Sequence, residues 1–327
     1  MRALLCHAFG PPETLRIAEI GQAPCPENAV RIAVAACGAN FADILMVAGE
    51  YQRKPPFPFS PGLEAAGTVT EVGALVRRVK PGDRVMALVD HGAFRDELIA
   101  LERDVVPIPA GMDFVTAAGF GISYDTALGA FAWRARLMAG ETVLVTGAAG
   151  GVGLAAVEVA KAMGARVIAA AGSAEKCART LSHGADHAID YRRQDLRAAL
   201  KAICPGGIDV LFDPVGGDVF AQALRAAAFE ARLIVIGFAG GERQAIPANI
   251  LLVKNASAIG FAWTAYRRDR PAMMHESFPQ LFAWWQDGRL KPLVSAVMDL
   301  ADAPKALARL GDRTVQGKIV LTTAARR

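Results

Sequence analysis

The chain has 327 residues, of which 53% are hydrophobic and 21% are charged, and this composition excludes an intrinsically disordered protein. The length corresponds to roughly two domains. The 32 glycines follow no three-residue period, which excludes a collagen-like chain. A net charge of +4 is too small to indicate nucleic acid as the main partner or an anionic membrane as the site of action.

The cysteines and the apolar stretches bear on the cellular compartment. The five cysteines are scattered and form no CxxC pair, so a disulfide framework is not expected and a reducing compartment fits best. The first residues lack the apolar core and cleavage site of a signal peptide. The most apolar stretch, residues 142–172, is interrupted by charged residues and glycines, so we expect no membrane span and a cytoplasmic protein.

The first third of the chain is typical of a β-rich domain. Apolar or β-branched runs at residues 31–36, 67–72 and 83–88 are bounded by Gly, Pro and Asp, which predicts three short strands. Prolines recur between Pro55 and Pro109, and this argues against long helices in the region. A compact barrel or sandwich is therefore expected here.

The pattern changes near residue 111, where two helices are predicted over residues 114–128 and 130–138. Strands and helices then alternate to residue 260, and this alternation indicates a parallel sheet covered by helices on both faces. The expected strands are 142–146, 166–170, 210–213, 232–236 and 257–261, and the expected helices are 153–163 and 174–183.

The segment from Thr142 to Gly153 has the features of a phosphate-binding turn. A buried-type strand is followed by a glycine-rich turn and a helix, and this context makes a glycine motif informative. Backbone N–H groups at Gly150, Gly151 and Val152 can approach a pyrophosphate at the positive end of the helix, and Gly153 lets the helix pack close to the strand. We therefore expect a dinucleotide here, although Ala148 stands where the usual motif has its first glycine.

The residues at the ends of the next strands favour NADPH over NADH. An NAD site usually has Asp or Glu about 20 residues beyond the glycines, and the strand 166–170 ends without an acid. Ser173, Lys176, Tyr191 and Arg192 stand there instead, and hydroxyl and cationic groups suit the dianionic 2′-phosphate. The alternative is that Lys176 and Arg192 are ordinary surface charges.

Six motifs at consistent spacing carry a resemblance to a known family. The chain resembles the medium-chain dehydrogenase/reductase superfamily, and within it the NADPH:quinone oxidoreductases that include zeta-crystallin. The motifs are Asn40-Phe41-Ala42-Asp43, Gly49-Glu50-Tyr51, Pro61-Gly62-Leu63-Glu64, Val79-Lys80-Pro81-Gly82-Asp83-Arg84-Val85, Ala148-Ala149-Gly150-Gly151-Val152-Gly153 and Gly317-Lys318-Ile319-Val320-Leu321.

The resemblance implies an α/β fold, with a GroES-like β-rich catalytic domain and a Rossmann domain built on a doubly wound parallel sheet. We expect the catalytic domain at residues 1–120, completed by 266–327, and the NADPH-binding Rossmann domain at 121–265. The final predicted strand, 317–321, follows a helix that contains Phe278 and Trp285, and we infer that this tail returns to the first domain.

No metal site is expected. Zinc-dependent members of the superfamily have Cys at the position of Asn40 and His at that of Leu63, and an amide and an isobutyl group cannot replace those ligands. Residues 88–106 contain none of the cysteines of the family's structural zinc lobe. Cys37 lies two or three positions away from the ligand position and is better interpreted as a packing residue.

The resemblance also suggests roles near the reacting atoms. Asn40 and Tyr51 are the expected catalytic residues, with Asn40 near the nicotinamide ribose and the Tyr51 hydroxyl able to bind a carbonyl oxygen or donate a proton. An aromatic lid with no chemical role is the alternative for Tyr51. Asp43 resembles a residue beside the ribose, or it caps a helix that begins near Phe41. Thr126 resembles a residue near the nicotinamide carboxamide.

Three aromatic residues complete the expected cofactor site. Phe238, Phe261 and Trp263 follow predicted strands and resemble residues that line the cofactor. Each is equally compatible with a core position.

The expected activity is hydride transfer from NADPH to a quinone without zinc. The alternatives are reduction of α,β-unsaturated ketones, aldehydes or enoyl thioesters, and, as a different class, a non-catalytic crystallin-like or NADPH-responsive RNA-binding protein. Because relatives commonly pair the edge strand of the nucleotide domain, and because residues 257–261 are apolar and suited to an edge strand, we also expect a homodimer.

Overall fold

The computed structural model describes residues 1–323. The chain forms two compact units: unit 1 comprises Met1–Ile122 and Pro292–Arg327, and unit 2 comprises Ser123–Lys291. The sequence assigned residues 266–291 to the first domain, whereas they group with unit 2. The physical reason is that helix α9 (Pro271–Gln286) is anchored within unit 2, where its Ser277 hydroxyl donates to the Asp125 carboxylate.

Unit 1 is built on a seven-stranded sheet in the order β14-β15-β3-β4-β5-β7, with β6 also paired to β3, and a separate two-stranded sheet joins β1 and β2. This unit has the β-rich GroES-like architecture expected from the sequence. Its strands are β1 (Arg2–Leu5), β2 (Arg16–Glu19), β3 (Ala29–Ala39), β4 (Glu64–Val72), β5 (Arg84–Leu88), β6 (Glu97–Leu101), β7 (Val105–Pro107), β14 (Val294–Asp299) and β15 (Lys318–Thr322).

The C-terminal strand of the chain joins the seven-stranded sheet of unit 1. Strand β15 pairs antiparallel with β3, so that Leu321 is opposite Cys37. The C-terminal strand therefore belongs to the sheet of unit 1. The helices of this unit are α1 (Phe41–Ala48) and α10 (Ala303–Gly311), and α2 (Phe114–Leu128) crosses the division at Ile122.

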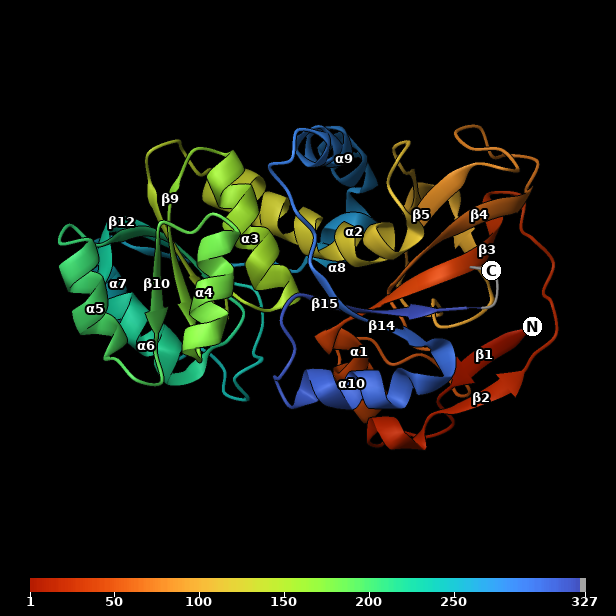
Figure 1. Ribbon diagram of the computed structural model, residues 1–327, viewed down its shortest axis with the longest axis horizontal. Coiled ribbons are helices and arrows are strands. Elements are labelled where there is room, and N and C mark those ends of the chain that lie inside the picture. The colour runs from red at the N-terminus through yellow and green to blue at the C-terminus, as the bar shows by residue number, and fades with distance from the viewer. Residues whose placement is uncertain (324–327) are drawn as a thin grey trace. The chain divides into compact units, whose positions relative to one another are not determined.

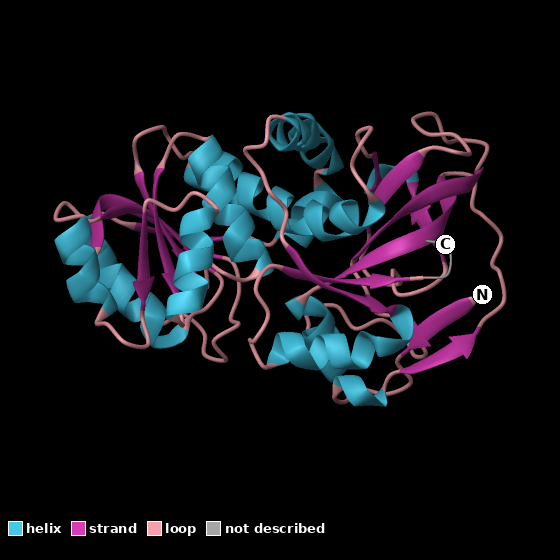
Figure 2. Cartoon of the chain, in the orientation of Figure 1, coloured by secondary structure: helices cyan, strands magenta, loops and turns pink. Residues whose placement is uncertain are grey.

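Unit 2 is a doubly wound domain. Its six strands are all parallel, in the order β10-β9-β8-β11-β12-β13, which confirms the Rossmann-type fold predicted from the sequence. The strands are β8 (Thr142–Thr146), β9 (Arg166–Ala171), β10 (His187–Asp190), β11 (Ile208–Asp213), β12 (Ala227–Val235) and β13 (Ser257–Gly260). The remaining helices are α3 (Gly151–Ala162), α4 (Ala174–Ser182), α5 (Leu196–Ile203), α6 (Gly217–Arg225), α7 (Ala248–Lys254) and α8 (Trp263–Asp269), and a π-helical turn covers Gly129–Ala135 (Figures 1 and 2).

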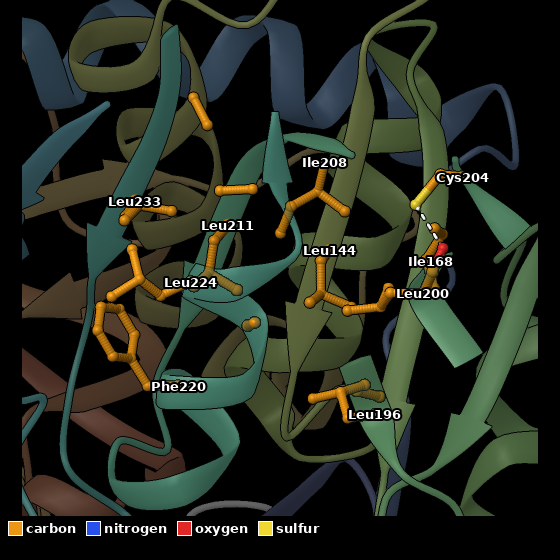
Figure 3. Packing of buried hydrophobic residues seen from close by; sticks show 14 of the residues in the cluster. Leu144, Ile168, Leu196, Leu200, Cys204, Ile208, Leu211, Phe220, Leu224 and Leu233 are labelled. Carbon is orange, nitrogen blue, oxygen red and sulfur yellow. Dashed lines mark hydrogen bonds between the residues drawn. The ribbon is translucent and has the colours of Figure 1, made fainter. Parts of the chain in front are cut away.

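A continuous core holds α5 and α6 against the parallel sheet. Leu144 of β8 and Leu211 of β11 pack with Leu200 of α5 and with Phe220 and Leu224 of α6, and all five are buried (Figure 3). Each such side chain contributes about 1.5–3 kcal/mol when it is fully buried. The core therefore fixes the strands whose carboxyl ends form the candidate nucleotide site.

No helix among residues 1–323 is both long enough and apolar enough to span a bilayer.

Candidate functional site

The glycine-rich turn joins β8 to α3. The turn begins at Gly147, which has a φ of +56°, and Gly150 is the N-cap residue of α3. A Cβ atom added to Gly153 would overlap the Gly147 carbonyl oxygen, so the start of the helix packs directly on the turn. Gly151 and Val152 form the first turn of the helix, where backbone N–H groups have no partner within the helix. The geometry is that of an anion-binding helix N-terminus.

The order of the strands locates this turn in the sheet. The chain runs from β8 to β9 and β10 on one side and then crosses to β11 on the other side of β8, so the carboxyl ends of β8 and β11 mark the point where the winding reverses. In open α/β sheets, ligands bind at this point. The turn after Thr146 therefore lies where a dinucleotide is expected.

A buried carboxylate organises the loop beside the turn. Asp213, at the end of β11, is fully buried and accepts hydrogen bonds from the backbone N–H groups of Val215 (3.2 Å) and Gly216 (3.0 Å). The Thr146 hydroxyl and the Gln244 side-chain amide (2.6 Å) also donate to it. The sequence motifs did not point to Asp213 as a site residue, although an acid that ends a buried strand is a usable signal.

The four residues expected to bind the 2′-phosphate come together around Gly172, just after β9. A Cβ atom added to Gly172 would lie 3.3 Å from Arg192 Nε and 3.4 Å from Tyr191 Oη. Ser173 is the N-cap residue of α4, and its Oγ accepts from the Lys176 backbone N–H at 3.2 Å. Burial lowers the pKa of Lys176, and the positive charge of Arg192 lowers it further. Because the two cations repel each other, an anion bound between them would be favoured.

Unit 1 contains a buried polar cluster at Asn40, Glu64 and Lys318. The Lys318 ammonium donates to Glu64 Oε1 at 2.6 Å and to Asn40 Oδ1 at 2.7 Å. The Asn40 amide nitrogen donates to Glu64 Oε1 (3.0 Å) and to the Gly38 carbonyl (3.2 Å). The second Glu64 oxygen accepts from the Ile122 backbone N–H at 3.0 Å. Both amide protons of Asn40 are therefore engaged within the protein, and the amide can offer a ligand only its oxygen.

Asp43 lies beside this cluster and stabilises the start of α1. Its carboxylate accepts from the backbone N–H groups of Asn40 (2.8 Å) and Gly62 (3.1 Å). Burial raises the pKa of Asp43 to about 7, although these N–H donors and Lys318 act in the opposite direction. The observed contacts of Asp43 are those of a helix cap, which is one of the two alternatives that the sequence left open.

Tyr51 and Thr126 lie in different units. Tyr51 is half-buried and follows α1, and its backbone N–H donates to the Leu45 carbonyl at 3.0 Å. Thr126 is buried on α2 and belongs to unit 2. Both remain predictions as site residues.

The three aromatic residues expected along the cofactor have different surroundings. Trp263 is buried, and its indole N–H donates to Asp125 Oδ2 at 2.6 Å. Phe261 is also buried and packs against Tyr266 with ring centroids 5.3 Å apart. Phe238 follows β12 and is 40% exposed. The contacts of Trp263 and Phe261 are those of core residues, whereas Phe238 is accessible to a ligand.

Asp125 is a second buried acid that the sequence motifs did not single out. Its carboxylate is fully buried, and burial raises its pKa to about 7 against the opposing effect of the Ser277 and Trp263 hydrogen bonds. These three side chains tie α2, α8 and α9 together within unit 2. No local sequence signal joins residues this far apart.

Among residues 1–323, no three His, Cys, Asp or Glu side chains lie close enough together to hold a metal ion.

Comparisons with known proteins match the two units separately and the chain as a whole. Residues 26–110 match the alcohol dehydrogenase GroES-like domain family, and residues 151–281 match the zinc-binding dehydrogenase family. The chain is 41% identical over 323 residues to quinone oxidoreductase-like protein 2 of Bos taurus, covering 98% of this chain and 92% of that protein. It is 32% identical over 313 residues to the quinone oxidoreductase of Rattus norvegicus, covering 94% and 92% of the two chains.

Solved structures resemble the whole chain. The Escherichia coli quinone oxidoreductase complexed with NADPH has a TM-score of 0.89 and 29% identity, covering 98% of this chain and 100% of that chain. The Thermus thermophilus quinone oxidoreductase, solved alone and with NADPH, has a TM-score of 0.85 and 34% identity at the same coverage. The chain therefore belongs to the quinone oxidoreductase family of medium-chain dehydrogenases/reductases.

Proposed function

We propose that this oxidoreductase transfers a hydride from NADPH to a quinone and does so without zinc. The observation that carries the cofactor assignment is the gathering of Ser173, Lys176, Tyr191 and Arg192 around Gly172, next to the glycine-rich turn. The acceptor assignment is supported by the relatives named quinone oxidoreductase.

The chain offers a matching group for each charged part of NADPH. The N-terminal turn of α3, at Gly150, Gly151 and Val152, suits the pyrophosphate. Lys176 and Arg192 suit the 2′-phosphate, because charge-assisted hydrogen bonds to a dianion are among the stronger polar interactions. NADPH supplies the hydride, and the protein supplies binding, orientation and electrostatics.

The cluster around Lys318 supports a zinc-independent site. A catalytic zinc ion would need thiolate, imidazole or free carboxylate ligands, but Asn40 offers an amide and Glu64 is already bonded to the Lys318 ammonium. The Asn40 oxygen is an acceptor, so it suits a hydroxyl group of the nicotinamide ribose better than an acceptor carbonyl. Polarisation of the acceptor would then depend on hydrogen-bond donors such as the Tyr51 hydroxyl, or on solvent.

We further propose that the protein is a cytoplasmic homodimer. Strand β13 is the edge of the sheet in unit 2, and the adjacent helix α7 exposes Leu252 (77%) and Val253 (78%). An unpaired edge next to exposed apolar side chains favours association with a second copy. Light scattering of the wild-type protein and of a Val253→Asp variant tests this proposal, and a monomeric wild-type protein would contradict it. Cysteines that are all free suit a reducing compartment.

The activity test follows NADPH oxidation at 340 nm with EDTA-treated protein. One arm contains 1,4-benzoquinone and the other a simple enone, each corrected for its spontaneous rate. Rapid oxidation with the quinone alone supports the proposed function. A preference for the enone would assign the protein to the enone or enoyl-thioester reductases, and cofactor binding without turnover would favour a non-catalytic role. Loss of activity on EDTA treatment, with recovery on adding zinc, would contradict zinc independence.

A further inference from the structure

Unit 2 contains a pocket that is distinct from the glycine-rich turn. Its volume is about 410 Å³, within the range of small-molecule sites. It lies where the C-terminal ends of α3 and α4 meet the segment that follows α9. It is lined by Glu158, Lys161, Ala162, Leu181, Ser182, His183, Gly184, Gly288, Arg289 and Lys291.

The pocket is well separated from the start of α3. Lys161 lies ten residues beyond Gly151 on α3, which corresponds to about 15 Å along a helix that rises about 1.5 Å per residue. A group bound at Lys161 would therefore not occupy the pyrophosphate position at Gly151.

Three cations line this pocket, and two of them are uncommitted. The Arg289 and Lys291 side chains are exposed and form no hydrogen bond or ion pair with any residue that the structure describes. Lys161 pairs with Asp186 at 2.9 Å, but that pair is partly exposed and solvent-screened. A ligand can recruit all three ammonium and guanidinium groups without breaking a buried contact.

The single carboxylate that lines the pocket has a hydrogen-bond partner on each of its oxygens. Glu158 is buried, and its Oε2 accepts from the Tyr124 hydroxyl (2.6 Å) and from the Lys291 backbone N–H (2.9 Å). Its Oε1 bonds to His183 Nδ1 at 2.5 Å. Among the described residues, Glu158 forms its side-chain ion pair with His183 and not with the Arg289 guanidinium or the Lys291 ammonium, so both cations remain available to a ligand.

The carbonyl groups at the C-terminal ends of the neighbouring helices do not bind the pocket cations either. A helix C-terminus carries partial negative charge on its last carbonyl groups, which often attract Lys and Arg. Here backbone N–H groups bond those carbonyls: Met163 to Val159 O (2.9 Å), Ala185 to Thr180 O (3.1 Å) and Arg289 to Trp284 O (2.9 Å). The side chains of Arg289 and Lys291 are left without that role.

We propose that this pocket is a second anion-binding site, built to take a phosphate group from a small molecule or from free inorganic phosphate. Guanidinium and ammonium groups that line the same pocket suit a dianion, since the Arg fork binds two oxygens and Lys supplies a point charge. The pocket volume leaves room for a small organic group attached to the phosphate.

Isothermal titration calorimetry with inorganic phosphate at low ionic strength tests the site directly. The key variant is Arg289→Ala/Lys291→Ala, and the matched control is Lys176→Ala/Arg192→Ala, which removes the other cluster of cations in unit 2. We expect saturable phosphate binding that the first variant weakens about tenfold or more and that the second variant retains. Circular dichroism checks that each variant is folded, and both pocket side chains are exposed, so folding should be unaffected.

The opposite pattern overturns the proposal. Phosphate binding that Arg289→Ala/Lys291→Ala leaves unchanged, or the absence of any saturable binding to the wild-type protein, shows that the pocket is not a phosphate site. Repeating the titration with a phosphate monoester such as glycerol 3-phosphate separates the two sources. Tighter binding of the ester assigns the site to a phosphorylated metabolite, and equal binding assigns it to the free anion. Neither result depends on the proposed hydride transfer.

Discussion

The Lys318 ammonium lies 2.6 Å from Glu64 Oε1, and the two residues are 254 positions apart in the chain. Both side chains are almost fully buried, which makes this the kind of ion pair whose desolvation costs several kcal/mol per charge. Hydrogen bonds from Asn40 and from the Ile122 backbone N–H to the same carboxylate offset part of that cost. The pair therefore fastens the C-terminal strand of unit 1 to the start of β4.

Removing one partner of this pair should destabilise the protein strongly. Lys318→Met leaves a buried carboxylate without its counter-ion, and we expect a loss of about 3–5 kcal/mol in the free energy of unfolding. Adding Glu64→Gln to that variant should recover part of the loss, because the uncompensated charge is then gone. Urea unfolding of the two variants measures both effects.

An exposed ion pair provides the control for this comparison. Lys305 pairs with Asp302, and the Lys305 side chain is 77% exposed, so Lys305→Met should have no measurable effect. If Lys318→Met costs no more than Lys305→Met, the buried pair does not stabilise the sheet.

The basic cluster at Gly172 should determine the choice of cofactor. Lys176→Ala and Arg192→Ala each remove one charged donor from the expected 2′-phosphate site. Such a hydrogen bond contributes about 1.5–3 kcal/mol, so KM for NADPH should rise about ten- to hundredfold, while KM for NADH should stay nearly constant. Arg193→Ala is the control, because Arg193 is adjacent in sequence but pairs with Asp190. An equal effect on both cofactors would contradict the assignment.

The sequence could predict the elements that carry a local signal. The uninterrupted apolar run of β8 and the glycines that follow it predict strand, turn and helix correctly, with α3 beginning two residues earlier than expected. The four-residue strand β10 was predicted only as a strand region that ends at Tyr191, without a defined start, since it is short and lacks β-branched enrichment. The position of α9 in unit 2 depends on contacts such as Ser277 with Asp125, which the pattern of α9 cannot indicate.

In the candidate site too, some residues carry a local sequence signal, whereas others are brought together only by long-range contacts. Lys176 and Arg192 follow strand ends in a repeating βα pattern, and topology alone brings such positions together at one edge of a sheet. Glu64 and Lys318 appeared only as members of motifs, and their pairing results from the antiparallel alignment of β15 with β3, which no local pattern specifies. The same applies to Asp125 and Trp263, which are 138 positions apart.

The protein should lose stability as the pH rises from about 4 to about 7. Burial raises the pKa of Asp125 from 3.8 to about 7 in the folded state, so the folded protein binds this proton more tightly than the unfolded chain does. The stabilising contribution is complete below pH 3.8 and is lost as the pH rises towards 7. Asp43 behaves in the same way, with a pKa of about 7.

An Asp125→Asn variant isolates one of these two groups. Its amide can still accept from the Trp263 indole and can donate to the Ser277 hydroxyl, so the packing is retained while the titrating group is removed. Between pH 4.5 and 7.5, thermal unfolding of the variant should show a clearly weaker dependence on pH than that of the wild-type protein. A slope identical to the wild-type slope would mean that Asp125 does not titrate in this range.

The glycine-rich turn should tolerate no side chain at Gly153. A methyl group there would overlap the Gly147 carbonyl oxygen and lie 2.8 Å from Ala148 Cα, so Gly153→Ala must push α3 away from the turn that is expected to hold the pyrophosphate. We expect NADPH binding, followed by fluorescence titration, to weaken at least about tenfold, with a lower thermal unfolding temperature. Gly206→Ala is the matched control, because a Cβ atom at Gly206 meets nothing within 4 Å and its φ is not positive. If Gly153→Ala binds NADPH as tightly as Gly206→Ala does, the close approach of helix and turn is not what forms the cofactor site.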